Sequence, residues 1–274
     1  MFDVSSTQLN IWIASFLWPL TRILGLISSA PLYGNVSVPA TTKILLGVLL
    51  SLIIAPTVPS LPSMDPMSLA GLLILVQQLI IGLAMGFAMR IVFAGVEMAG
   101  EISGMTMGLG FATFFDPQSQ GHSSAISQFL SLITLMIYLA TNMHLVLLSI
   151  LADSFTTMPI MATPLGNNFF NGLVTWGGHI FSIGVQLSLP IVTILLMTNI
   201  ALGILTRAAP QLNLFGIGFP VTIAAGFIML ALILPYLAMP LDRLFMEAMH
   251  MISGLTDASL SPLNSPLSSP LNRR

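Results

Sequence analysis

Ionisable side chains that could perform chemistry are few in this sequence, and their spacing suits contacts between helices better than catalysis. Glu97 and Glu101 lie four residues apart, which places both carboxylates on one face of a helix. Arg22 interrupts a long apolar run. Charged groups at membrane-like depth are costly and are usually paired or functional. We therefore interpret Arg22, Glu97 and Glu101 as interhelical or inter-subunit polar contacts, with a proton relay as the alternative.

The sequence patterns of common enzyme and metal sites are missing. The chain has no cysteine, and Lys43 is its only lysine. No HExxH, G-x-S-x-G or P-loop pattern occurs. Glu101–Gly104 is superficially similar to a loop of intramembrane serine proteases, but no histidine stands at a matching helical position. We predict neither an enzyme nor a cofactor or metal site. The histidines are scattered without ligand spacing: His122, His144, His179 and His250.

The overall composition indicates a surface that does not face water. Hydrophobic residues make up 55% of the 274 residues and charged residues only 6%, against roughly 25% charged in ordinary soluble domains. The surface must therefore face lipid or other protein. The formal net charge of −2 offers no basic face for a phosphate backbone, which argues against nucleic-acid binding.

Six apolar runs approach or exceed the roughly 20 residues that a helix needs to cross a bilayer core. Short links rich in proline, glycine and asparagine separate them, which favours antiparallel hairpins of neighbouring helices. We predict an all-α, membrane-type fold without a β-sheet. The runs are Leu9–Ala30, Ala40–Val58, Leu69–Met89, Ala125–Leu151, Leu173–Leu205 and Ile217–Met239.

The fifth run is too long for a simple perpendicular span. Leu173–Leu205 would form a helix of about 50 Å at 1.5 Å per residue, and Pro190 should kink it. Such a helix either tilts or does not cross a bilayer. After the sixth run, Leu241–Ile252 has the apolar spacing of an amphipathic helix. The Ser/Pro-rich tail, residues 254–274, is expected to be disordered.

Glycines at four-residue spacing predict close helix contacts. Gly82 and Gly86 form one such pair, and Gly100, Gly104 and Gly108 form a second series. Small residues on one helical face let two backbones approach closely. We expect both series to be packing faces.

The stretch after these glycines is the most unusual segment, because it is apolar and aromatic but too rich in glycine for a stable helix throughout. Irregular backbone at membrane-like depth is tolerated where it is buried in protein or lines a cavity. A deformable plug across a pore would suit this composition, since hydrophobic constrictions can block ions. A packed turn between helices is the alternative. The residues concerned are Met105, Met107, Gly108, Gly110, Phe111, Phe114 and Phe115.

The sequence of Leu205–Val221 resembles the signature of the FliR family, the flagellar biosynthetic proteins of the type III export apparatus. The pattern around Arg22, Pro31, Pro39 and Lys43, and the segment Gly108–Pro117, are similar to that family too. The resemblance covers roughly Ile11 to Met251.

The resemblance implies a non-enzymatic core subunit of an export gate, assembled with FliP and FliQ and associated with FlhB. It implies a FliP-like part at residues 1–172 and a FliQ-like hairpin with the amphipathic helix at residues 173–253. The family's plug loop corresponds to about residues 105–123. The expected location is the inner membrane at the flagellar basal body, with some helices raised out of the bilayer plane. Inter-subunit or interhelical contacts are assigned to Arg207, Pro210, Gln211 and Asn213.

Two other functions remain open. Virulence injectisomes contain an equivalent subunit that shares much of this pattern. A small multi-pass secondary transporter would suit glycine- and proline-broken segments with intramembrane charges. Against a transporter, the two halves of the sequence show no evident repeat and no cluster of polar residues converges on a substrate.

Overall fold

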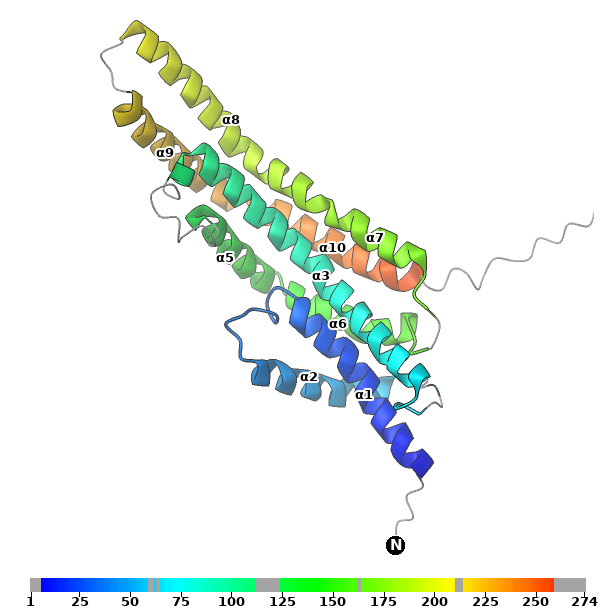
Figure 1. The fold of residues 1–274 in the computed structure, drawn as a ribbon. Coiled ribbons are helices and arrows are strands. Elements are labelled where there is room, and N and C mark those ends of the chain that lie inside the picture. Colours follow the sequence, from blue (N-terminus) through cyan, green and yellow to red (C-terminus); the bar gives the residue numbers. More distant parts are fainter. Residues whose placement is uncertain are drawn as a thin grey trace, which may run out of the picture. The chain divides into compact units, whose positions relative to one another are not determined.

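The computed structural model describes residues 6–58, 62, 65–111, 124–161, 164–209 and 214–258. Within these ranges the chain folds into helices, joined by turns, and forms no strand, which confirms the all-α prediction (Figure 1). The α-helices are α1 (Ser6–Ser29), α2 (Ala40–Ile54), α3 (Leu69–Thr106), α5 (Ala125–Ala140), α6 (Met143–Thr157), α7 (Asn167–Gly177), α8 (His179–Ala208), α9 (Leu214–Ile233) and α10 (Ala238–Ala258). Short 3-10 turns are η1 (Ala55–Thr57), η2 (Leu109–Phe111) and η4 (Leu234–Tyr236).

The chain divides into two compact units, and the long helix α3 contributes to both. The first unit contains Met1–Ala88, Leu145–Trp176 and Met249–Arg274. The second contains Met89–His144 and Gly177–Ala248. In the first unit α1 pairs with α2, and in the second α8 pairs with α9. These are the helical hairpins that the short links between apolar runs predict.

Helix α3 is longer than its apolar run, which the sequence suggested would end at Met89. It continues through Arg90, Glu97 and Glu101 to Thr106. Arg90 and Glu97 are exposed and Glu101 is half-buried, so none of these charges lies fully inside. A charged residue ends an apolar run but does not end a helix, because arginine and glutamate are good helix formers.

The fourth run forms two helices instead of one. These are α5 and α6, and the chain breaks between them at Thr141 and Asn142. Asn142, which lies between them, has a φ of 57°, a left-handed conformation that asparagine tolerates better than most residues. The fifth run also divides, at Gly178 between α7 and α8, whereas α8 continues through Pro190.

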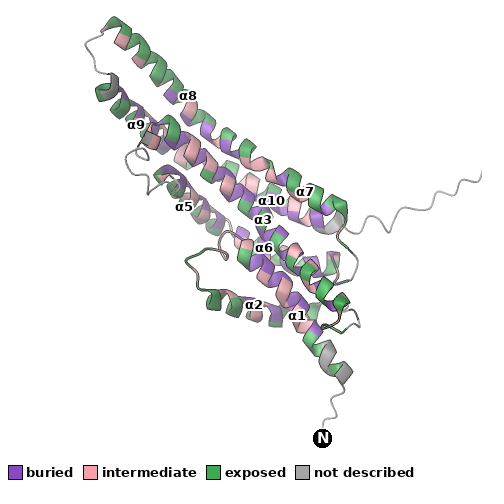
Figure 2. Ribbon diagram, in the orientation of Figure 1, coloured by how far each residue is buried: buried purple, intermediate pink, exposed green. Residues whose placement is uncertain are grey.

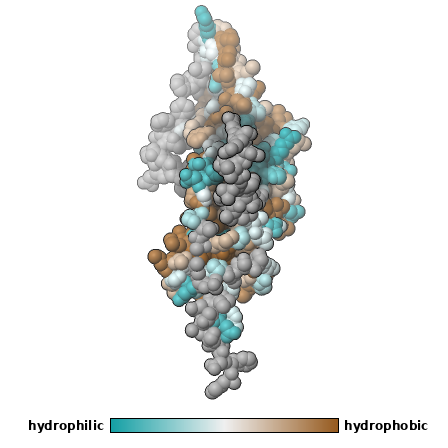
Figure 3. Space-filling view, turned by 90° about the vertical axis from the view of Figure 1, so that its right-hand side faces the viewer, coloured by the Kyte–Doolittle hydropathy of each residue, from teal (hydrophilic) through white to brown (hydrophobic). Residues whose placement is uncertain are grey.

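Five helices are long and apolar enough to cross a membrane within the described ranges, or six if the bent pair α5 and α6 counts as one span. Many large apolar residues are exposed. Figure 2 shows exposed residues along the helices, and Figure 3 shows hydrophobic patches on the surface. The 18-residue windows of the α2 and α9 spans are only 17% and 22% buried. This distribution is typical of a membrane-type protein, whose outer surface faces lipid or protein.

Candidate functional site

The glycine- and methionine-rich segment that the sequence predicts as a plug begins at the end of helix α3. The Gly108 N–H donates to the Met105 carbonyl at 3.0 Å, and the φ of Gly108 is 89°. This left-handed turn is strained for a residue with a side chain, so glycine is the residue that can end the helix here. The chain continues as the 3-10 turn Leu109–Phe111. Gly108 therefore sets the direction in which the glycine-rich segment leaves α3.

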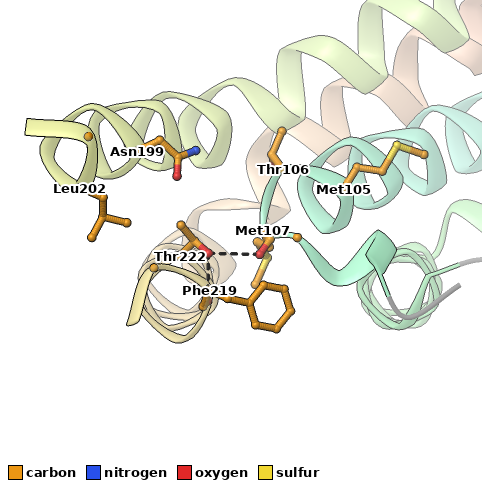
Figure 4. Close-up of a pocket in the computed structure, with 10 residues that line it drawn as sticks. Met105, Thr106, Met107, Asn199, Leu202, Phe219 and Thr222 are labelled. Carbon is orange, nitrogen blue, oxygen red and sulfur yellow. Dashed lines mark hydrogen bonds between the residues drawn. The ribbon is translucent and has the colours of Figure 1, made fainter. Parts of the chain in front are cut away.

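The two methionines at this end of α3 have opposite environments. Met107 is 1% exposed, whereas Met105 is 68% exposed. Met107 reaches helix α9 beside Thr222 and Phe219 (Figure 4). A Cβ atom added to Gly226 of α9 would lie 2.5–2.8 Å from the Cγ, Cε and Sδ atoms of Met107. The absence of a side chain at Gly226 is what makes room for the thioether.

An open cleft of about 410 Å³ lies next to this contact, between the end of α3 and the hairpin of α8 and α9. Its walls are mainly apolar or small side chains, and the polar groups are the amide of Asn199 and the hydroxyls of Thr106 and Thr222. Such a cleft can accept an apolar side chain or a hydrocarbon chain. The lining residues are Met105, Thr106, Met107, Gly108, Asn199, Leu202, Gly203, Gly218, Phe219 and Thr222.

The buried face of α9 consists of residues four positions apart, three of them small. These are Gly218, Thr222, Gly226 and Leu230, while large side chains such as Phe227 and Ile228 point outward. A face of this kind admits neighbouring helices closely, and membrane helices commonly pack through their small residues. Hydrophobicity cannot reveal this face, because α9 is apolar all round.

The glutamates of α3 contact the start of helix α5. The Ser124 N–H donates to Oε1 of Glu101 at 2.6 Å, and the Ser131 hydroxyl donates to Oε1 of Glu97 at 3.2 Å. The Ser127 hydroxyl donates to the Glu97 carbonyl at 2.8 Å. A carboxylate at a helix N-terminus is favourable, because the unpaired N–H groups there carry partial positive charge. The pair thus holds α5 against α3 within the second unit.

Arg22 is fully buried in the first unit and makes several hydrogen bonds. Its guanidinium donates to Oε1 of Gln78 at 2.7 Å, and to the carbonyl and hydroxyl of Ser154 at 2.8 and 3.0 Å. It also donates to the Met158 carbonyl at 2.9 Å, and its Cζ atom lies 4.3 Å from the centre of the Phe155 ring. The accepting carbonyls belong to the C-terminal end of α6, where a cation is favourable. Arg22 therefore joins α1, α3 and α6.

The predicted packing glycines lie at close helix approaches. A Cβ on Gly82 would overlap the backbone carbonyl of Arg22, and one on Gly86 would overlap the hydroxyl of Ser29. In the second unit, a Cβ on Gly100 would overlap the backbone of Ser127 in α5. Gly104 is less confined, since its Cβ would be 3.2 Å from the Ser124 hydroxyl oxygen.

The structure locates only some of the remaining residues that the sequence selected. Gly110 is half-buried after the end of α3, and Phe111 closes the 3-10 turn. Arg207 is exposed in the last turn of α8. Phe114, Phe115, Pro210, Gln211 and Asn213 lie outside the described residues.

Most residues that α8 and α9 contribute to this region were not selected from the sequence, among them Asn199, Thr222 and Gly226. They are far along the chain from the end of α3, and no motif connects them to it. The four-residue spacing of Gly218, Thr222 and Gly226 was a signal that could have identified the face of α9, as the same spacing did on α3.

Comparisons with known proteins agree with this architecture. The family model described as bacterial export proteins, family 1, matches residues 13–248. Two relatives, each named flagellar biosynthetic protein FliR, come from Pectobacterium carotovorum subsp. carotovorum and Escherichia coli (strain K12). Each is 41% identical over 255 residues, which cover 93% of this chain and 97% of the relative. A Bacillus subtilis (strain 168) protein of the same name is 30% identical over 251 residues, covering 89% and 96%. The chain therefore belongs to the FliR family of flagellar biosynthetic proteins, within bacterial export proteins, family 1.

Proposed function

We propose that the chain is a core subunit of the flagellar type III protein export gate, which assembles with FliP, FliQ and FlhB in the bacterial inner membrane. Membership of the family makes it a membrane component of the flagellar export apparatus. The proposal adds that it helps to form and seal the channel through which unfolded flagellar proteins pass. It performs no catalysis of its own in this scheme.

The proposal rests on the hairpin of α8 and α9, whose apolar side chains are largely exposed to solvent in the chain on its own. No residue of α8 after Leu195 is buried, although this stretch includes Leu196, Met197 and Ile204. The helix has 30 residues, so at 1.5 Å per residue it is about 45 Å long and exceeds a bilayer core of about 30 Å. Unless the helix tilts strongly, the lipid core would not cover its whole length. Partner subunits would.

Closure of the gate is assigned to the segment that follows α3. Met105, Met107, Gly108, Gly110 and Phe111 belong to it in this proposal, together with Phe114 and Phe115. Exposed Met105 and the flexible thioether groups suit a seal that conforms to irregular neighbours. The left-handed turn at Gly108 sets the direction in which the segment leaves α3.

The proposal also divides the chain by function. Residues 1–172 act as the FliP-like part and residues 173–253 as the FliQ-like hairpin with the amphipathic helix. Helix α10 buries Leu241, Phe245 and Ile252 at helical spacing and exposes Arg243 and Glu247, which suits an element packed along one side.

Assembly is tested by co-expression with FliP and FliQ in membranes, followed by purification in detergent and native mass measurement. We expect a stoichiometric hetero-oligomer. A monomer that purifies without its partners and takes up solute when reconstituted in vesicles would instead support the transporter alternative. Co-purification with injectisome homologues in preference to the flagellar proteins would favour the virulence alternative.

Closure is tested by deleting Gly110–Phe115. The deletion should preserve co-purification with FliP and FliQ while making the membrane permeable to ions, because the seal is removed and the packing helices are not. Unchanged ion permeability in an assembled complex would contradict the plug assignment.

A further inference from the structure

The interface of α1 and α3 contains buried hydrogen-bond donors for which the described residues supply no acceptor. These donors are Nε1 of Trp18 and Nε2 of Gln78, and both side chains are fully buried. The Gln78 amide is held in one orientation, because its Oε1 accepts from Nε of Arg22 at 2.7 Å and its Nε2 therefore points elsewhere. Buried donors are seldom left unpaired in folded proteins, since each unpaired group costs free energy. The two donors therefore indicate a bound acceptor.

Arg22 adds a third donor beside Gln78. A guanidinium carries five N–H groups, and the hydrogen bonds to Gln78, Ser154 and Met158 are four in number. The remaining N–H belongs to Nη2, whose one bond goes to the Met158 carbonyl. Within the described residues, the buried cation faces carbonyl, amide and hydroxyl oxygens and the ring of Phe155, but no carboxylate. A further acceptor is favourable beside such a cation, because charge-assisted hydrogen bonds are the stronger ones.

The three donor groups belong to one stretch of a single interface. Arg22 bonds to Gln78, and further along both helices a Cβ on Gly86 would overlap the Ser29 hydroxyl. The residue numbers therefore rise together along α1 and α3. Trp18 precedes Arg22 by about one helical turn on the same face of α1, so it lies at the level of Gln78 or one turn before it. All of these residues lie in the first unit.

The set consists of donors only, and this limits what can bind. An indole and a guanidinium have no acceptor atom, and the acceptor of the Gln78 amide already faces Arg22. Because the side chains that supply the donors are fully buried, the ligand must also be small. A water oxygen and a chloride ion both meet these conditions. Buried water typically makes about three hydrogen bonds to polar groups that are otherwise unpaired.

We propose that Trp18, Arg22 and Gln78 bind one small hydrogen-bond acceptor, a water molecule or a chloride ion, inside the interface of α1 and α3. The acceptor receives N–H bonds from Nε1 of Trp18, from Nε2 of Gln78 and from Nη2 of Arg22. It extends the hydrogen-bond network of Arg22 along α1 toward Trp18. The site stabilises a helix contact, and it is independent of the closure segment and of exported protein.

The indole N–H resonances test the proposal in the full chain, purified in detergent and isotope-labelled at the tryptophan nitrogen. Trp176 is a built-in reference, because its Nε1 donates to the Ala88 carbonyl at 2.8 Å. Substituting each tryptophan in turn by phenylalanine assigns the resonances. A hydrogen bond moves an indole N–H resonance downfield, so Trp18 should resonate in the range of Trp176. A Trp18 resonance clearly upfield of Trp176 would show an unpaired N–H and overturn the proposal.

Two further measurements identify the acceptor. If it is chloride, replacing chloride by gluconate should move the Trp18 resonance and leave that of Trp176 in place, because gluconate is too large for the site. If it is water, the Trp18 N–H should show a cross-peak to water protons that does not depend on the anion. A bonded Trp18 that shows neither effect would have its acceptor in the protein chain, and the proposal would be wrong.

A variant of Gln78 tests whether the donors share one ligand. Gln78→Met removes the amide at nearly constant volume, and the Trp18 resonance should move upfield because the ligand loses one of its donors. The matched control is Gln77→Met at the neighbouring, half-buried position of α3, which should leave the Trp18 resonance unchanged. A Trp18 resonance that is the same in Gln78→Met as in the original chain would contradict the shared site.

Discussion

The contact between α1 and α3 in the first unit and the hairpin of α8 and α9 in the second are built from similarly apolar sequence, yet they differ in completeness. Along α1, Trp18, Arg22 and Leu26 are fully buried, and Gly25 and Gly82 bring the two backbones together. Along α8, burial ends at Leu195. In the contact between α1 and α3, these residues of α1 are buried within the chain. In the hairpin, α8 and α9 each bury one face and leave the other faces exposed.

The difference shows that hydrophobicity does not decide which face of a membrane-type helix is interior. Small residues and buried hydrogen bonds do so, because apolar side chains are as stable against lipid as against protein. On α9 the buried face is Gly218, Thr222, Gly226 and Leu230, and the large side chains lie outside. The following predictions test this comparison, from the largest expected effect to the smallest.

The first prediction concerns Arg22→Ala, which should cause the largest loss of stability. The substitution leaves Gln78, Ser154 and Met158 without their buried donor. The Ser154 carbonyl still accepts from the Met158 N–H, so two acceptors, on Gln78 and Met158, lose their donor. At about 1–3 kcal/mol for each unsatisfied buried acceptor, we expect a total loss of about 2–6 kcal/mol in the free energy of unfolding. Thermal unfolding in detergent measures it. A variant as stable as the original would show that this network does not hold the first unit together.

The second prediction concerns the close backbone contact. Gly82→Ala places a Cβ against the backbone of Arg22, which cannot move as a flexible side chain could. We expect a loss of about 1–3 kcal/mol, the usual range for overpacking. Gly203→Ala in α8 is the matched comparison, because its Cβ meets open space. Equal stability of the two variants in detergent would show that the α1–α3 contact is no more sensitive to an added side chain than the exposed part of α8.

The third prediction concerns the start of α5. Glu101→Ala removes the acceptor of the Ser124 N–H, and we expect a loss of about 1 kcal/mol, as for other helix caps. Glu101→Gln keeps an acceptor oxygen and should lose less. Hydrogen exchange of the first turn of α5 reports the local effect. Faster exchange in the glutamine variant than in the alanine variant would contradict this capping role.

The smallest effect is expected for Arg207→Ala on the isolated chain. Arg207 is exposed at the end of α8, and substitutions of this kind change stability by less than about 0.5 kcal/mol. Co-purification with FliP and FliQ should nevertheless fall, since the proposal places Arg207 in an inter-subunit contact. Normal co-purification and export in the variant would show that this assignment is wrong.

Much of the fold could be predicted from the sequence, because long apolar runs and their glycine and proline breaks are local signals. The all-α class and the family follow from these runs and from Leu205–Val221. The break at Asn142 was not predicted, since Thr141 and Asn142 are only a short polar interruption of the apolar run Ala125–Leu151. The spacing of the glutamates and glycines after Met89 indicates helix there, but the sequence did not predict that this helix is continuous with the apolar run and ends at Thr106.

The candidate site could be predicted only in part. The sequence selected Met105, Met107 and Gly108, since glycine and methionine are concentrated there. It did not select Thr222 and Gly226. Their four-residue spacing with Gly218 indicates a packing face on α9, but it does not indicate that this face contacts Met107, because that contact depends on the absence of a side chain far along the chain. Long-range fit of this kind has no local sequence signal.

The claim that partner subunits cover the α8–α9 hairpin is tested by measuring the exposure of this hairpin with and without those partners. Ile204→Cys would introduce the chain's only thiol at a position that is 66% exposed. Its rate of reaction with a maleimide is measured in one detergent, for the chain alone and for the complex with FliP and FliQ. The account predicts fast labelling of the chain alone and strong protection in the complex. Equal labelling rates in the two samples, with the complex intact, would contradict it.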